Sequence, residues 1–214
     1  MQKGKFIVIE GVEGSGKSTL VAQAKSIFDR QQLLTTREPG GSDFGEAIRE
    51  LMFKHPLSSA TTPETQFGLV WAARADHLAK LIKPTLETGI SVLCDRFDAS
   101  TYAYQIWASG ATHLEQLFWE MRTAYLMHQP PDHYLFLDAQ PTVTLARIAN
   151  RSTGKNFFDE KELAFHERVY EGYQRFFARV PVTMIDATKP QVEVEEEFMR
   201  ILNEILKPDT DVPF

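Results

Sequence analysis

Five short apolar segments recur along the chain, and each is rich in β-branched or aromatic residues. None of them alternates cleanly between apolar and polar positions, which is typical of strands that are buried on both faces of a sheet. The pattern therefore predicts five interior strands. They cover residues 6–9, 33–36, 92–94, 134–137 and 182–185.

Longer stretches with helical spacing of their apolar residues separate these strands. They cover residues 17–31, 43–54, 64–88, 98–127 with a break near Gly110, 141–149, 159–178 and 190–206. Strands that alternate with helices predict an α/β fold of three layers, in which a five-stranded parallel sheet carries helices on both faces. Because no repeat or Gly/Ser-rich linker divides the sequence, we expect residues 1–214 to form a single domain.

Composition narrows the class of protein further. The 214 residues carry a net charge of −6, which argues against a broad basic surface for nucleic acid or for a membrane. The single cysteine, Cys94, excludes a disulfide framework and fits a reducing compartment. The chain also has no apolar run of bilayer length and no signal-peptide core, so we expect a cytoplasmic protein.

The strongest motif lies between the first strand and the first helix. Residues 11–19, Gly-Val-Glu-Gly-Ser-Gly-Lys-Ser-Thr, match the phosphate-loop pattern G-x-x-x-x-G-K-[ST]. Backbone N–H groups of such a loop face inward, the lysine reaches the β- and γ-phosphates, and the serine holds Mg²⁺. The motif predicts an ATP site formed by Gly11, Gly14, Ser15, Gly16, Lys17, Ser18 and Thr19.

Charged residues at the carboxyl ends of the strands suggest a second anion site. Glu10, Asp95 and Asp138 end three strands, and Arg37 and Arg96 stand at the ends of two. The carboxyl ends of parallel strands form the binding edge of such a sheet. Arginine forks match phosphate oxygens, and together with Arg74 of a long helical stretch they favour a second, phosphate-bearing substrate.

A Ser/Thr/Gly break near residues 148–160 separates two helical stretches and predicts a short lid that closes over phosphates. Its basic candidates are Arg147, Arg151 and Lys155. The six histidines show no metal-ligand spacing, so we assign no catalytic role to any of them.

Together these segments resemble the thymidylate kinase family over nearly the whole chain. The resemblance rests on the phosphate loop with Glu13, on Thr-Arg-Glu-Pro-Gly-Gly at 36–41, on Ala-Ala-Arg at 72–74 and on the run that begins Asp-Arg-Phe-Asp at 95–98. It implies a homodimer that transfers the γ-phosphoryl group of ATP to dTMP, giving dTDP for dTTP biosynthesis.

The resemblance also implies roles for single residues. Glu13 would meet the 3′-hydroxyl, Arg96 the dTMP phosphate, and Tyr104 the sugar, while Asp95 and Ser18 would hold Mg²⁺. The catalytic residues would be Lys17, Arg96 and Arg151, with Arg147 on the ATP side. The implied dTMP site consists of Glu13, Arg37, Val70, Arg74, Arg96, Ser100, Thr101, Tyr104 and Gln105.

Three positions depart from the family pattern. Val70 stands where relatives usually carry a phenylalanine that stacks on thymine, Phe157-Phe158 stand where a lid arginine is usual, and Ile106-Trp107 replace small residues. Two alternatives therefore stay open. One is a kinase for another pyrimidine deoxynucleotide, such as dUMP or a 5-substituted relative, which Val70 would accommodate. The other is a nucleotide-gated regulatory ATPase that has no monophosphate substrate.

Overall fold

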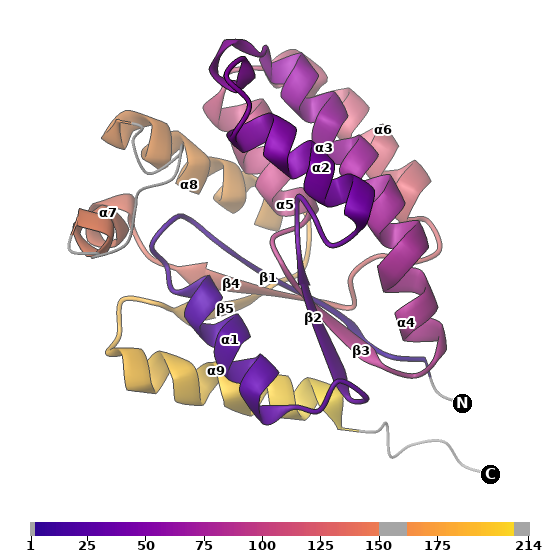
Figure 1. Cartoon of the computed structure of the whole chain (residues 1–214). Coiled ribbons are helices and arrows are strands. Elements are labelled where there is room, and N and C mark those ends of the chain that lie inside the picture. Colours follow the sequence, from indigo (N-terminus) through magenta and orange to yellow (C-terminus); the bar gives the residue numbers. More distant parts are fainter. Residues whose placement is uncertain (1–2, 150–161, 208–214) are drawn as a thin grey trace.

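The computed structural model describes residues 3–149 and 162–207, and it confirms the predicted five-stranded parallel sheet (Figure 1). The strands lie in the order β2-β3-β1-β4-β5, and all four pairs of neighbours are parallel. The strand bounds are β1 Phe6–Gly11, β2 Leu33–Arg37, β3 Ser91–Asp95, β4 His133–Asp138 and β5 Thr183–Asp186.

Helices cover both faces of the sheet, as predicted (Figure 1). α1 (Lys17–Ile27) and α9 (Gln191–Leu206) lie on one face. The other face carries α2 Asp43–Phe53, α3 Pro63–His77, α4 Lys83–Glu87, α5 Asp98–Thr101, α6 Glu115–Leu126 and α8 Leu163–Phe177. α7 (Pro141–Ala149) follows β4, and most of the predicted lid lies outside the described residues. Within the described part of the chain, no helix combines the length and the apolar character that crossing a membrane requires.

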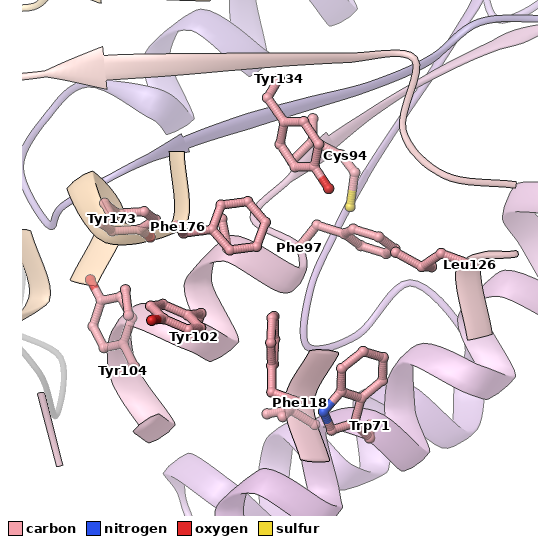
Figure 2. Packing of buried hydrophobic residues seen from close by; sticks show 14 of the residues in the cluster. Trp71, Cys94, Phe97, Tyr102, Tyr104, Phe118, Leu126, Tyr134, Tyr173 and Phe176 are labelled. Atoms are coloured by element: carbon pink, nitrogen blue, oxygen red, sulfur yellow. The ribbon is translucent and has the colours of Figure 1, made fainter. Parts of the chain in front are cut away.

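Each face of the sheet has its own hydrophobic core because successive residues of a strand point to opposite sides. In β1, Ile7 and Ile9 join the core beneath α1 and α9, whereas Phe6 and Val8 join the larger core on the opposite face. This explains why the strand sequences show no alternation. The larger core is rich in aromatic rings, among them Trp71 (Figure 2).

The predicted helices differ from the observed ones mainly at their ends. The first helix ends at Ile27 rather than near residue 31, because the side chain of Asp29 accepts a hydrogen bond from the backbone of Gln31 and forms a turn. The predicted helix 64–88 contains a π-helical turn at Leu78–Ile82 between α3 and α4. The predicted break near Gly110 is confirmed, since this glycine adopts a φ of 76° after the π-helical segment Tyr102–Ala108.

The closest packing of α8 is against the segment Tyr102–Ala108. A Cβ atom added at Gly172 of α8 would lie 2.7 Å from the Cα atom of Ala103 and 3.0 Å from the Cβ atom of Trp107. Position 172 therefore has no room for a larger side chain, although glycine has a low helix propensity. This contact holds α8 beside the chain that follows β3.

We expect Gly172→Ala to lower the free energy of unfolding by about 1–2 kcal/mol, because the overpacking outweighs the improved helix propensity. Gly68 in α3 is the matched control, since a Cβ atom there meets nothing within 4 Å. Gly68→Ala should raise the same free energy by about 0.5–1 kcal/mol. Urea unfolding measures both changes. A stabilised Gly172→Ala variant would show that the helix yields at this contact.

Candidate active site

The phosphate loop connects β1 to α1 and is folded tightly against α7. Gly14 adopts a φ of 76°, and a Cβ atom there would lie 2.6 Å from the carbonyl oxygen of Thr144. The side chain of Ile148 would also be within 3.2 Å. Only glycine satisfies both the backbone conformation and this close approach. The same contact places α7, which carries the half-buried Arg147, next to the loop.

Lys17 is buried within the loop that it follows. Its Nζ atom donates hydrogen bonds to the carbonyl oxygens of Gly11 at 2.7 Å and of Val12 at 2.9 Å. Burial, together with the nearby charge of Arg96, lowers the pKa of Lys17 to about 8. The amine is thus hydrogen-bonded to the loop, and its pKa lies below that of an ordinary lysine.

Arg96 follows β3 and adopts a positive φ of 69°, which is rare for a residue with a side chain. Its Nη2 atom donates to Oε1 of Glu13 at 2.7 Å, and its Nη1 atom donates to the hydroxyl of Tyr173 at 2.9 Å. The second carboxylate oxygen of Glu13 accepts a hydrogen bond from Tyr104. Burial alone would raise the pKa of Glu13, but the charges of Arg96 and Lys17 hold it below its ordinary value.

Glu10 supports this turn from below and is completely buried. Its carboxylate accepts hydrogen bonds from the backbone N–H of Phe97 at 2.8 Å, from Oγ of Ser100 at 2.6 Å and from the hydroxyl of Tyr173 at 3.0 Å. Burial raises the pKa of Glu10 above its ordinary value. These bonds fix the chain on the carboxyl side of Arg96. Because Tyr173 also accepts a hydrogen bond from the guanidinium, Glu10 and Tyr173 together orient the Arg96 side chain.

Arg74 of α3 is a second buried cation, with 1% of its surface exposed. Its Nε atom donates to Oε2 of Glu38 at 2.8 Å, and its Nη2 atom donates to Oγ1 of Thr101 at 2.9 Å. The guanidinium lies between the rings of Trp71 and Phe97, whose centroids are 4.6 Å and 4.8 Å away. Its Nη1 atom is buried and makes no hydrogen bond within the described residues. One donor is therefore left over for a ligand.

One cavity of about 640 Å³ joins these groups. Of the sequence-predicted site residues, those that line it are Glu13, Gly14, Gly16, Lys17, Ser18, Thr19, Arg37, Val70, Arg74, Asp95, Arg96, Ser100, Thr101, Tyr104 and Gln105. Gly11 and Ser15 belong to the loop but are not part of the cavity lining, and both contact the amine of Lys17. Arg37 is exposed at the rim and pairs with Glu46 at 3.0 Å. Arg151 and Lys155 lie outside the described residues.

The sequence did not predict that α2 lines the cavity, nor that Tyr173 of α8 supports Arg96. The lining from α2 includes Arg49, Met52 and Phe53, which sequence spacing presents as ordinary helix positions. Tyr173 likewise reads as a core residue of α8. Glu38 also lines the cavity and was not predicted to do so. Its position within the predicted Arg-Glu-Pro-Gly-Gly turn is the sequence signal that could have indicated it.

The residues present fit a magnesium ion bound together with nucleotide phosphates. Ser18 and Asp95 both line the cavity, and Oδ1 of Asp95 is buried without a hydrogen-bond partner in the described part of the chain. Residues 3–149 and 162–207 contain no group of three or more His, Cys, Asp or Glu side chains arranged to hold a metal. The oxygen atoms of Ser18 and Asp95 suit Mg²⁺, which keeps several waters and takes phosphate oxygens as ligands.

The fold and the cavity together define a class of protein. A phosphate loop between the central strand and α1 of a parallel sheet, facing a second buried cationic group across the same cavity, is the architecture of a P-loop kinase.

Comparisons with known proteins identify the family within that class. The thymidylate kinase family model matches residues 9–198. The thymidylate kinase of Alkalilimnicola ehrlichii is 39% identical over 194 residues, which cover 89% of this chain and 88% of that protein. That of Protochlamydia amoebophila is 38% identical and covers 94% of this chain and 93% of its own. The crystal structure of the Ehrlichia chaffeensis thymidylate kinase superposes with a TM-score of 0.71, at 26% identity, over 94% of this chain and 99% of that one. This chain belongs to the thymidylate kinase family.

We expect Glu38→Gln to lower the free energy of unfolding by about 3–5 kcal/mol, because it leaves the buried charge of Arg74 without its partner. Glu46→Gln is the matched control, since the Arg37–Glu46 pair is about half exposed and should contribute less than about 1 kcal/mol. Chemical denaturation of the two variants measures the difference. Equal losses would mean that Arg74 finds another counter-charge.

Proposed function

We propose that this protein transfers the γ-phosphoryl group of ATP to dTMP and releases dTDP and ADP. One observation carries the proposal: a single cavity holds both the phosphate loop with Lys17 and a second set of cations, the buried Arg74 and the partly buried Arg96. A protein that only binds or hydrolyses ATP has no need of the second set. Two anionic substrates that must meet do need it, since fixed positive charge offsets their repulsion.

On the ATP side, backbone N–H groups of the loop and the N-terminus of α1 would hold the phosphates. Lys17 would exchange its bonds to the carbonyls of Gly11 and Val12 for the β- and γ-phosphate oxygens. Ser18 and Asp95 would hold Mg²⁺, and the ion would offset the negative charge of the phosphates. Arg147 on α7 stands beside the loop and would assist with the donor, as would Arg151.

On the dTMP side, the main proposed contacts come from side chains that hydrogen bonds within the site already orient. Arg96 would bind the phosphate, and Glu13 would accept a hydrogen bond from the 3′-hydroxyl while Tyr104 packs beside the sugar. Nη1 of Arg74, buried and without a partner, would donate to a carbonyl oxygen of the base beside Thr101. Arg37, Val70, Ser100 and Gln105 complete the proposed lining.

The chemistry then requires positioning rather than a general base. The second pKa of a phosphate monoester is about 6, so the acceptor oxygen is already largely ionised at neutral pH. That oxygen attacks the γ-phosphorus as the bond to the bridging oxygen of ADP breaks. Lys17 and Arg96 stabilise the charge that develops on the transferred oxygens. We also propose that the protein acts as a homodimer in the cytoplasm, with residues 1–214 as one catalytic domain.

A substrate panel tests the proposal. ADP release measured by a coupled assay with each nucleoside monophosphate should show the highest kcat/KM with dTMP. A preference for dUMP or for a bulkier 5-substituent would favour the alternative that Val70 enlarges the base site. Calorimetry with dTMP alone addresses the other alternative, because a regulatory ATPase should bind no dTMP.

We expect Lys17→Met to reduce ADP formation by about 10³-fold or more, since the variant loses a charge at the transferred phosphoryl group. Lys25→Met provides the matched control, because Lys25 is an exposed lysine of the same helix. The control should keep nearly full turnover, and circular dichroism should show that both variants are folded. Near-normal turnover by Lys17→Met would refute the assigned role.

We expect the affinity for ATP to depend on the titration of Lys17. The pKa of its amine in the free protein is about 8, so the charged form is present below pH 8 and is lost above it. Because phosphate binds the charged form, the Kd for ATP should rise about tenfold for each pH unit above 8. Calorimetry in buffers of different ionisation enthalpy should show proton uptake on binding in that range. A Kd that stays constant between pH 8 and pH 9.5 would contradict this expectation.

A further inference from the structure

We infer that Phe53, at the C-terminal end of α2, provides the aromatic face against which the nucleobase of the monophosphate packs. The inference rests on the proposed function and adds a residue that determines base affinity. It concerns the part of the cavity lining that α2 contributes. This helix lies beside α3 (Figure 1).

Among the described residues, the cavity is lined by three aromatic side chains, Phe53, Phe97 and Tyr104. Phe97 is 1% exposed. Tyr104 is 5% exposed, and its hydroxyl donates to Glu13. Phe53 alone of the three is half-buried rather than buried. Its ring therefore has surface left to offer a ligand.

Phe53 lines the same cavity as the polar groups that would meet the edge of the base. Val70 is one helical turn before Arg74 on α3, so both side chains share one face of the helix. The donor of Arg74 without a partner and the hydroxyl of Thr101 mark where the polar edge of the base would lie. Val70 lines the same cavity but has no π-face and is only 6% exposed. We therefore infer that the flat face of the base packs against Phe53, the most exposed of the three rings.

Arg49 fixes the orientation of Phe53. Its guanidinium lies 5.3 Å from the ring centroid and donates through Nη1 to the carbonyl oxygen of Pro39 at 2.9 Å. A cation that is anchored to the Arg-Glu-Pro-Gly-Gly turn and lies over the ring stabilises one ring position. The ring also packs against the larger core. An aromatic side chain held in this way loses little freedom when a base stacks on it.

Phe53→Leu tests the inference, with Phe53→Tyr as the conservative variant. Loss of base stacking should raise the Kd and the KM for dTMP about fivefold to tenfold, with kcat changed by less than about twofold. Phe53→Tyr should retain the affinity of the unmodified protein because the ring face is kept. Phe44→Leu is the matched control, since Phe44 belongs to the same helix but is 57% exposed and lies outside the cavity lining.

A double-variant cycle separates a direct contact with the base from a change in folding. Val70→Phe should weaken dTMP binding in the unmodified protein by crowding the site, yet strengthen it in the Phe53→Leu background by supplying a ring. Additive effects, or a Phe53→Leu variant with unchanged Kd for dTMP, would overturn the inference while the proposed function stands. If the unmodified protein neither binds nor phosphorylates dTMP, both fail together.

Discussion

The position of the Arg96 guanidinium is the constraint on which the site depends. Its backbone adopts a left-handed conformation, and a buried carboxylate, Glu10, accepts hydrogen bonds from the backbone of Phe97 and the hydroxyl of Ser100, which follow it in the chain. Glu13 and Tyr173 then fix the side chain itself. These groups come from β1, the phosphate loop, the end of β3 and α8. The cation is thus placed by the whole fold, before any substrate arrives, and electrostatic stabilisation of phosphoryl transfer needs such preorganisation.

Arg74 follows the same principle on α3. A buried guanidinium is stable only with a partner close by, and Glu38 provides it while two aromatic rings cover its faces. Each of its three nitrogens has a different environment. Nε donates to Glu38, Nη2 donates to Thr101, and Nη1 has no hydrogen-bond partner among the described residues. In the proposed function, Arg96 is the cation for the phosphate and Arg74 is the cation for the base. The aromatic ring of Phe53 on α2 adds an apolar contact to these polar ones.

Much of the fold could be predicted from the sequence because its two signals, the apolar runs of the strands and the phosphate-loop motif, are local. Strands buried on two faces give continuous apolar runs, and the phosphate loop is contiguous, so the sequence predicts both the sheet and, within residues 11–19, seven residues of the ATP site. The support network could not be predicted, since Glu10 and Tyr173 are 163 positions apart. Phe53 and Arg49 fall at ordinary helix positions, and only the approach of α2 to α3 places them at the cavity. The lid falls largely outside the described residues, and the roles of Arg151 and Lys155 stay predictions.

The central claim is that two polyanions occupy one cavity at the same time, and calorimetry tests it most directly. dTMP is titrated into the protein alone and into the protein saturated with Mg²⁺ and a non-hydrolysable ATP analogue. The account predicts one dTMP per chain in both titrations, with the analogue remaining bound. Displacement of the analogue by dTMP, or the disappearance of dTMP binding when the analogue is present, would contradict it.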